Sequence, residues 1–532
     1  MTDTGRPHAG SPVPTDALGS GEGRDERLAL ARAVTGLLDW AQETTAQRVP
    51  ALVTRLREHL GEGAADATVV SREFAVFDRV NLQLALEAWA AEPGRSVEVV
   101  GYTIPPHFGT VDVAQMLQGT HLPPLRVTSP PVDDLPSGPT STTAVWRAVL
   151  LLVTDPRGRH ALHVRGPADQ HGHSGLTVEA AGLETAAAQE LLGELEALRS
   201  AKNVYRGQVL EISANDHGGV ALRFPDLPRT DRDDVVLPEA VLARVERHTL
   251  AVAARREVLR ASGQHLKRGL LLYGPPGTGK THTTRYVVTH LPQTTALLLS
   301  GRSLHLIGAV AAMARELQPA VVVLEDVDLV AEDRSFGHGM NPVLFELLDA
   351  MDGAAADADL LFLLTTNRAE ALERALAARP GRVDVALEIG LPDADARRRL
   401  LRLYSRAVPL TASDEVVEEV VARSEGVTAS FVKELVRRAV LEAAMAQDDG
   451  ASSAGEAVRE VTGEHLRHAL DDLLDSTQAL TRALLGVPAD QGADRGDDEV
   501  VSYEGSYEPG VQVVQTAEQY RSGGGWFRHS PR

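Results

Sequence analysis

The sequence contains no cysteine, and aromatic residues make up only 4% of it. The absence of cysteine excludes disulfides, thiolate catalysis and cysteine-based zinc sites, and it is typical of proteins in a reducing compartment. No apolar run reaches the about 18 residues that a membrane-spanning helix needs. The polar start MTDTGRPHAG also has no apolar signal segment. These absences predict a cytoplasmic protein that does not contact a membrane.

Basic residues are outnumbered by acidic ones. The chain has 53 Lys and Arg against 74 Asp and Glu, a formal net charge of -21. A chain of this charge repels a phosphate backbone, which argues against broad nucleic-acid binding. Hydrophobic residues account for 43% of the 532 positions and charged residues for 24%, a balance typical of globular proteins with more than one domain.

The first half of the chain offers no motif with interpretable chemistry. Residues 1–24 and 481–532 are rich in Gly, Ser, Pro or acids without a sustained period, so we expect both to be disordered. The pattern of residues 25–230 predicts an α+β region. This region is either one unit or two subdomains that are divided near a Pro-, Ser- and Thr-rich linker at 120–143. Within it, AVWRAVLLLVT is expected to form a strand, and GQVLEIS and GVALRFP a hairpin.

The sequence pattern changes after residue 230, where helical segments alternate with short apolar strands. The strands are GLLLY, TALLLS, AVVVLE, LLFLLTT and ALEIG. This alternation predicts an α/β fold, a parallel sheet with helices on both faces. Ligands of such sheets bind at the carboxyl ends of the strands, which is where the motifs described below fall.

The segment GPPGTGKT follows the strand GLLLY and opens a helix, the context of a phosphate-binding loop. Its glycines let backbone N–H groups converge on phosphates, Lys280 adds a positive charge, and Thr281 offers a hydroxyl to Mg²⁺. His282 is included in the nucleotide site, although a packing or solvent-facing role also fits it. The predicted nucleotide-binding residues are Gly274, Pro275, Pro276, Gly277, Thr278, Gly279, Lys280, Thr281 and His282.

Polar residues follow two further strands. Glu325 and Asp326 come after AVVVL, and we expect one acid to hold the metal and the other to orient the attacking water. Asn367 ends LLFLLTT, where its amide can donate to a γ-phosphate; a turn-forming Asn is the alternative. Arg379 and Arg382 lie in the turn ARPGRVD and are either solvated charges or stabilisers of transition-state charge.

Together these motifs resemble those of the AAA family of ATPases over residues 235–474, nearly half of the chain. GLLLYGPPGTGKT resembles the Walker A segment and AVVVLEDVD the Walker B segment. FELLDAMDG resembles the helix that follows, and TTNR with ARPGRVDVALEIGLPD resembles the second region of homology. The resemblance implies ATP and Mg²⁺ as ligands, a large subdomain over 231–392 and a helical lid over 393–480.

The resemblance also places further residues. Gly426 and Ala429 match a stretch of the lid where the family commonly has a small residue. The adenine is expected beside Val235 and Val236.

The family works as rings, usually hexamers, and the resemblance implies that this chain is a homo-oligomer. ATP would lie between the P-loop of one subunit and Arg379 and Arg382 of its neighbour. We expect such a ring to remodel a protein substrate that residues 25–230 select. The alternative is a nucleotide-gated scaffold with slow hydrolysis.

The sequence departs from the family in its acidic pair. The usual order is Asp then Glu, whereas here Glu325 takes the metal-side position with Thr281, and Asp326 takes the catalytic position. A similar order occurs in the branch of the mitochondrial translocase of the Rieske iron–sulfur protein. Because both carboxylates remain and differ by one methylene, we expect hydrolysis to be retained.

A second departure concerns the loop with which many AAA unfoldases grip an extended chain. The family pattern is an aromatic residue, an apolar residue and Gly, but here the segment is Leu306, Ile307 and Gly308. Leu offers less flat contact area than Tyr or Phe. The sequence therefore predicts a weak grip and puts threading in doubt.

The predicted role of Arg379 in the neighbouring site can be tested. Arg379→Ala should abolish ATP hydrolysis and leave ATP binding largely intact, because the guanidinium acts on transition-state charge. That effect is worth roughly 10³–10⁵ in rate in other phosphoryl-transfer enzymes. Steady-state turnover and equilibrium binding should be measured on one preparation, and normal turnover would exclude the role in trans.

Overall fold

The computed structural model describes most of the chain between residues 49 and 475. The described positions are 33, 36, 49–105, 110–119, 122–166, 175–214, 220–328, 358–368, 383–448 and 458–475. The two segments that the sequence predicts to be disordered, 1–24 and 481–532, lie outside these positions.

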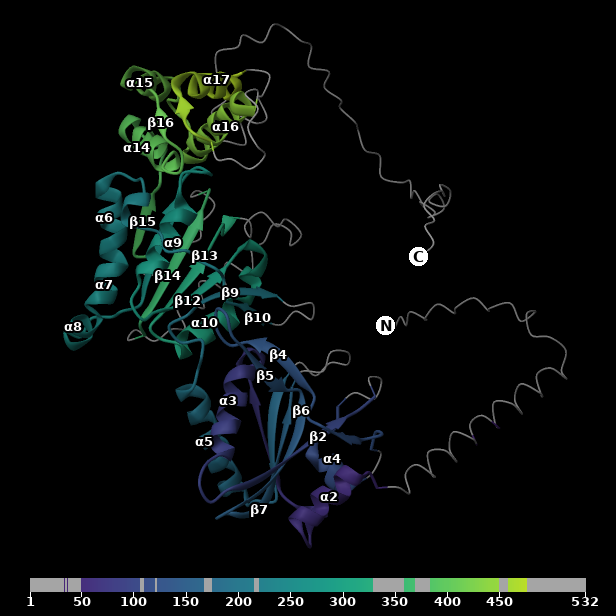
Figure 1. Cartoon of the computed structure of the whole chain (residues 1–532). Coiled ribbons are helices and arrows are strands. Elements are labelled where there is room, and N and C mark those ends of the chain that lie inside the picture. The colour runs from purple at the N-terminus through teal and green to yellow at the C-terminus, as the bar shows by residue number, and fades with distance from the viewer. Residues whose placement is uncertain are drawn as a thin grey trace, which may run out of the picture. The chain divides into compact units, whose positions relative to one another are not determined.

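The N-terminal half is built on a six-stranded antiparallel sheet (Figure 1). In spatial order its strands are β1 (Val69–Phe74), β8 (Leu176–Ala181), β7 (Gly158–Arg165), β6 (Ala148–Asp155), β2 (Ser96–Thr103) and β3 (Arg126–Thr128). A separate hairpin joins β4 (Val132–Pro136) to β5 (Thr142–Trp146). The helices of this half are α2 (Ala51–Leu60), α3 (Arg79–Ala90), α4 (Val113–Gln118) and α5 (Thr185–Ala201), with short 3₁₀ turns at Ala64–Asp66 and Val76–Asp78.

Strand β6 has apolar side chains on both faces of the sheet, and helices cover each face. Val149, Leu151 and Val153 pack into a core with α3 and α5. Leu150 and Leu152 point to the other face and pack into a core with α2 and α4. Because side chains alternate along a strand, a strand covered on both faces must be apolar at every position. The α+β character predicted for this region follows from these two cores.

Two local expectations in this half were wrong. AVWRAVLLLVT forms two strands, β5 and β6, which belong to different sheets. Between them the main chain of Arg147 bonds outside both ladders, to the carbonyl of Pro131 and the N–H of Gly166. The stretch 120–143, expected to be a linker, contains β3 and β4. The apolar pattern of a segment indicates that it forms a strand, but which strand it pairs with depends on residues distant in the sequence.

The C-terminal half is built on a seven-stranded sheet that is parallel except at one edge. Its spatial order is β10 (Val220–Arg223), β9 (Val209–Ala214), β12 (Thr295–Leu299), β13 (Ala320–Leu324), β14 (Leu360–Thr366), β11 (Arg268–Tyr273) and β15 (Val385–Glu388). Only the β9–β10 pair is antiparallel. The α/β fold predicted for this half is confirmed, with every expected strand present.

Helices flank this sheet and then form a small separate bundle. The first group is α6 (Glu239–His248), α7 (Leu250–Ala254), α8 (Arg256–Ala261), α9 (Lys280–His290) and α10 (Ile307–Glu316), with 3₁₀ turns at Arg232–Asp234 and Gly301–Leu306. The bundle contains α14 (Ala394–Tyr404), α15 (Asp414–Arg423), α16 (Ala429–Asp448) and α17 (Gly463–Leu474), around one apolar core. It also has a two-stranded pair, β16 (Leu410–Thr411) with β17 (Val461–Thr462). Within the described ranges, no helix is long and apolar enough to cross a membrane.

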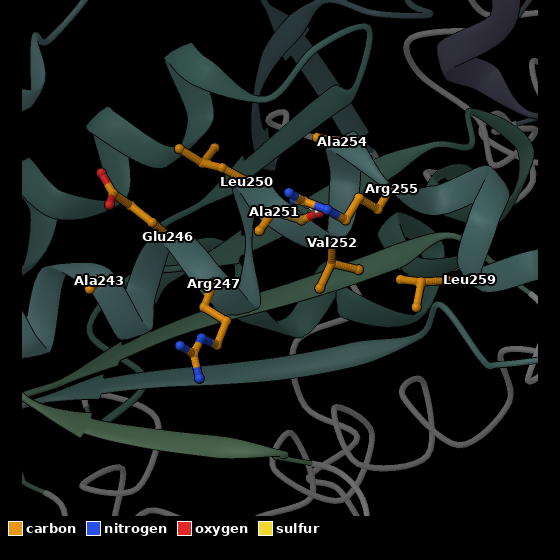
Figure 2. Close-up of a pocket in the computed structure, with 9 residues that line it drawn as sticks. All are labelled: Ala243, Glu246, Arg247, Leu250, Ala251, Val252, Ala254, Arg255 and Leu259. Atoms are coloured by element: carbon orange, nitrogen blue, oxygen red, sulfur yellow. Dashed lines mark hydrogen bonds between the residues drawn. The ribbon is translucent and has the colours of Figure 1, made fainter.

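Helices α6, α7 and α8 line a groove of about 780 Å³ on the surface of this half (Figure 2). Leu250, Val252 and Leu259 give it an apolar lining, while Arg247 and Arg255 add charge. None of the predicted site residues contributes to this groove. It is therefore separate from the predicted nucleotide site.

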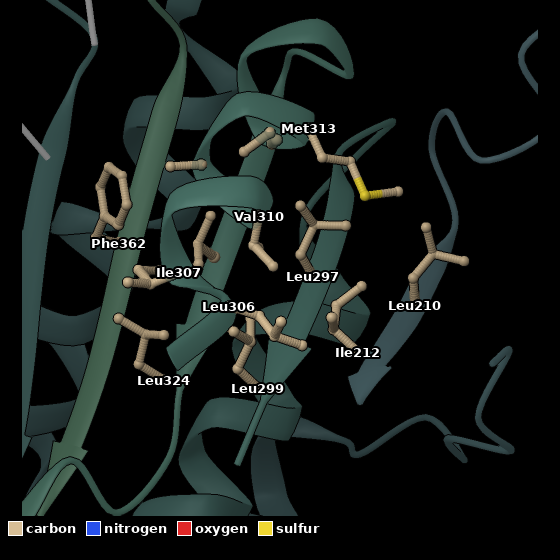
Figure 3. Close-up of a cluster of buried hydrophobic side chains, with 14 of the residues drawn as sticks. Leu210, Ile212, Leu297, Leu299, Leu306, Ile307, Val310, Met313, Leu324 and Phe362 are labelled. Carbon is tan, nitrogen blue, oxygen red and sulfur yellow. The ribbon is translucent and has the colours of Figure 1, made fainter. Parts of the chain in front are cut away.

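The hairpin expected near the end of the N-terminal region is present, but it is part of the second sheet. β9 pairs in parallel with β12, and β10 pairs with β9 at the edge. Leu210 and Ile212 of β9 lie in the same apolar core as Leu297 and Leu299 of β12 (Figure 3). The hairpin thus adds two strands to the sheet that carries the phosphate-binding loop.

The segment that resembles a substrate-gripping loop is packed into this same core. Leu306 is 8% exposed and Ile307 is 1% exposed, whereas His305 beside them is exposed. Figure 3 shows both apolar side chains among those of β12, β13 and α10. The predicted weak grip has a physical cause beyond the missing aromatic ring, since these side chains are not available to an extended polypeptide.

Truncating Ile307 will show whether it supports the core. Ile307→Ala should lower the free energy of unfolding by about 2–5 kcal/mol, the usual cost of deleting a large apolar side chain from a packed core. Denaturant titration of the full chain measures this. His305→Ala is the matched control and should change stability by less than about 0.5 kcal/mol, because its side chain is exposed. Equal effects of the two substitutions would contradict the packing described.

Candidate functional site

The phosphate-binding loop connects β11 to α9 and depends on backbone conformations that favour glycine. Gly274, Gly277 and Gly279 have φ angles of 145°, 77° and 106°. A Cβ atom on Gly274 would lie 2.3 Å from the carbonyl oxygen of Ile389, so the loop also requires a close approach to the chain after β15. These constraints aim successive N–H groups toward one side of the loop, as a phosphate cradle requires.

Lys280 is 6% exposed, and its ammonium group lies inside the loop. Nζ donates to the carbonyl oxygens of Gly274 and Pro275, each at 2.8 Å. Burial lowers the pKa of Lys280, and the negative charges of Asp326 and Asp328 oppose that effect. The cation is therefore held between the loop and the acids, where a bound phosphate would replace the carbonyls as its partner.

Thr281 and Glu325, the two predicted metal ligands, are brought together by the fold. The Thr281 side chain lies close enough to the Glu325 carboxylate to lower the pKa of Glu325. Burial and the adjacent Asp326 charge raise the pKa of Glu325, whereas the Arg285 charge and the Thr281 side chain act in the opposite direction. A hydroxyl and a carboxylate are the oxygen ligands that Mg²⁺ prefers, so this pair fits the ion that the sequence implies.

Asp326 has an uncommon backbone conformation for a residue other than glycine, with φ at 51°. Its N–H donates to Oγ1 of Thr365 at 3.1 Å, and its Oδ1 accepts from Nδ2 of Asn367 at 3.3 Å. Asp is among the residues that tolerate the left-handed region, but the conformation still costs free energy and is enriched at functional sites. The neighbouring strands thus hold the two predicted catalytic side chains in contact.

Asp328 belongs to this site, although the sequence analysis assigned it no role. Its side chain is 6% exposed, and its Oδ1 accepts from Oγ1 of Thr366 at 3.0 Å and from the N–H of Asn367 at 3.1 Å. Asp328 therefore fixes the end of β14 and positions Asn367. The available signal was the third acid in LEDVD, two residues after Asp326.

The helical bundle contacts the phosphate-binding loop directly. The N–H of Ser430, in the first turn of α16, donates to the carbonyl oxygen of Gly277 at 3.0 Å, and its hydroxyl donates to the same oxygen at 3.3 Å. The resemblance pointed to Gly426 and Ala429 here, and the contact is made by the residue after Ala429. Any movement of α16 is thereby transmitted to the loop.

His282 lies beside the segment where the adenine is expected. Its ring lies near the main chain of Asp234, the residue before Val235. Burial lowers the pKa of His282, and the cations Arg285 and Lys433 act in the same direction. Val235 is buried in the core of the sheet, while Val236 packs against the bundle core, so this segment joins the two parts.

The remaining predicted site residues are placed as follows. Pro275, Pro276, Thr278 and Gly279 form the loop, with Oγ1 of Thr278 donating to the carbonyl of Pro275 at 2.9 Å. Arg379 and Arg382 lie outside the described residues, so their proposed contribution to a neighbouring site stays a prediction.

Comparison with known proteins agrees with this geometry. Residues 270–391 match the family model described as "ATPase family associated with various cellular activities (AAA)". The span includes the loop, both acids and Asn367. The matched span runs from β11 to just after β15, and the N-terminal half lies outside it.

Three curated relatives are similar to the same part of the chain. A cell division cycle protein 48 homolog of Archaeoglobus fulgidus is 32% identical over 197 residues, 35% of this chain and 27% of the relative. A 26S proteasome regulatory subunit 8 homolog of Schizosaccharomyces pombe is 34% identical over 29% of this chain and 42% of the relative. A proteasome-activating nucleotidase of Methanocaldococcus jannaschii is 27% identical over 43% and 56% respectively. The chain thus spans between about a quarter and just over half of the length of these relatives.

Removing the Asp328 carboxylate should disturb the site through Asn367. Asp328→Ala leaves a buried hydroxyl and a buried N–H unsatisfied, at about 1–3 kcal/mol each in stability. Displacement of Asn367 should then lower ATP turnover by roughly 10–100-fold with a smaller effect on ATP affinity. Asp328→Asn is the control, because its amide oxygen can still accept both bonds. Unchanged turnover in Asp328→Ala would show that Asn367 does not depend on it.

Proposed function

Because residues 270–391 form a domain of the AAA family of ATPases, we propose that this chain hydrolyses ATP as a ring-forming machine that remodels protein partners. The observation that carries the proposal is the convergence of the phosphate loop, Thr281 with Glu325, and Asp326 with Asn367 at one edge of the sheet. Bound Mg²⁺ would supply positive charge that offsets the charge developing on the phosphates.

Each side chain of the nucleotide site would have a distinct role in ATP hydrolysis. Lys280, freed from the two loop carbonyls, would pair with the terminal phosphates. Glu325 and Thr281 would hold the metal, while Asp326, fixed by Asn367, would orient the attacking water. The reversed order of the acids suits this division, since the Thr281 side chain lies beside the Glu325 carboxylate.

A ring is required if Arg379 and Arg382 complete the site of a neighbouring subunit. The number of subunits, six in the family's usual case, and a cytoplasmic location remain predictions from the sequence. The protein substrate is to be sought through the N-terminal half, which is built on a sheet of its own and lies outside the matched residues. The composition continues to argue against nucleic acid as the partner.

Contacts with the N-terminal half suggest how nucleotide-driven movement would be used. Arg199 of α5 pairs with Asp78 at 2.7 Å and with Glu316, at the end of α10, at 2.6 Å. The Arg206 guanidinium donates to the Glu316 carbonyl at 3.3 Å. Helix α10 begins at Ile307, which is buried in the core of the sheet. A displacement of this helix would therefore also move the residues of the N-terminal half that contact Glu316.

A nucleotide-gated scaffold is the second candidate, and one observation favours it. Leu306 and Ile307 are packed in the core, so their side chains are not available to grip an unfolded chain. In this alternative, ATP holds a ring that displays the N-terminal halves, and hydrolysis is slow. Both candidates share the same nucleotide site.

Steady-state ATP hydrolysis against protein concentration distinguishes the two. A machine should turn over continuously, with a rate per subunit that rises as rings form and then levels off. A scaffold should bind ATP and stall after about one turnover per site. Lys280→Ala is the control for contaminating activity and should show no turnover, because it removes the cation that pairs with the phosphates. Turnover that persists in Lys280→Ala would contradict the assigned site.

A further inference from the structure

A single buried guanidinium lies between three carboxylates where the two halves of the chain meet. Nη1 of Arg199 lies 2.7 Å from Oδ2 of Asp78 and 2.6 Å from Oε1 of Glu316. Its Nη2 and Nε atoms donate to the Glu196 carboxylate at 2.6 Å and 3.2 Å. Asp78, Glu196 and Arg199 belong to the N-terminal half, whereas Glu316 is the last residue of α10 in the other half.

Asp78 and Glu316 compete for the same nitrogen. The contact of Nη1 with Asp78 has the geometry of a hydrogen bond. Oε1 of Glu316 is buried and has no hydrogen-bond partner among the described residues, although it lies as close to Nη1 as Asp78 does. Glu316 is therefore attracted to Arg199 by charge but lacks the hydrogen bond that Asp78 receives.

The cluster has more negative than positive charge, and Asp78 is the acid that water helps least. The side chains of Glu196 and Glu316 are 42% and 29% exposed, whereas that of Asp78 is 3% exposed. Burial raises the pKa of Asp78 to about 6, and the charges of Glu316 and Glu196 act in the same direction. Arg199 and the hydrogen bond from Nδ2 of Asn81, at 2.9 Å, oppose this rise in the pKa.

The other polar groups beside Asp78 have partners of their own. Arg79, the next residue in the chain, directs its Nη2 to Asp133 at 2.7 Å. The hydroxyl of Tyr205 donates to the carbonyl oxygen of Phe77 at 3.0 Å. Arg199 is therefore the cation on which the charged form of Asp78 depends.

We propose that Asp78, Arg199 and Glu316 form a proton-controlled latch between the two halves of the chain. A protonated Asp78 no longer competes for Nη1, so the guanidinium gives Glu316 a full hydrogen bond and fastens α10 to α5. A charged Asp78 keeps the Nη1 hydrogen, and α10 is held less tightly. The latch is independent of ATP hydrolysis, because every group in it lies outside the nucleotide site.

The direction of the pH effect follows from the pKa of Asp78. It is higher in the fold than the value of about 3.9 in an unfolded chain. The stabilisation that the bound proton gives is complete below this unfolded value and is lost as the pH rises through about 6. Between about pH 7.5 and pH 5, the equilibrium for opening the latch should change by up to about tenfold in favour of the closed form.

Hydrogen exchange of the α10 amides measures this opening in the full-length protein without nucleotide. Labelling times are scaled so that the intrinsic pH effect on exchange cancels. Wild-type exchange should then be up to about tenfold slower at about pH 5 than at about pH 7.5. Asp78→Asn has no charge and can still accept the bond from Asn81, so its α10 should exchange slowly at both pH values. Glu98→Gln, an exposed acid on β2 that pairs with Arg55, is the control and should keep the wild-type pH effect.

A second variant removes the other side of the latch and keeps the test decisive if Asp78→Asn does not fold. Glu316→Ala should give fast α10 exchange with no pH effect. Loss of an acid from the C-terminal end of a helix does not weaken the helix itself, so faster exchange there reports the lost contact. A pH effect that persists in Asp78→Asn, or wild-type exchange in Glu316→Ala, would overturn the latch and leave the proposed ATPase function untouched.

Discussion

The pairing of β14 with both β11 and β13 is the constraint on which the candidate site depends. These strands run parallel, so the phosphate loop after β11, the acids after β13 and Asn367 after β14 all emerge at one edge of the sheet. Gly274 then passes so close to Ile389 that no side chain fits between them. The ladder therefore positions the side chains before any of them contacts a ligand.

Polar contacts at that edge set the finer geometry. Asp328 holds the backbone of Asn367, whose amide in turn bonds Asp326, so one buried carboxylate positions a second through an intervening amide. Thr281 and Glu325 form a separate pair on the metal side. The inverted order of the two acids is therefore compatible with a site in which Glu325 holds the metal and Asp326 orients the water, because each carboxylate has its own neighbour.

One edge of the sheet accounts for the burial of the segment that resembles a substrate-gripping loop. The β9–β10 hairpin extends the sheet beyond β12, and its Leu210 and Ile212 join the core that encloses Leu306 and Ile307. A loop whose apolar side chains complete a core cannot release them without losing that packing. The same core contains Val80 and Tyr205, so the N-terminal half packs against the same core as Leu306 and Ile307.

The sequence by itself determined the α/β fold, the five central strands, the phosphate loop and the residues expected around it, because local periodicity and motif spacing encode them. It did not reveal the partners of β5 and β6, the sheet joined by the β9–β10 hairpin, or the burial of Ile307, since strand pairing and packing depend on residues distant in the chain. The role of Asp328 and the position of Arg199 between Asp78 and Glu316 likewise emerged only from the tertiary structure. A hydrogen bond is defined by where two groups meet, and only the folded chain brings them together.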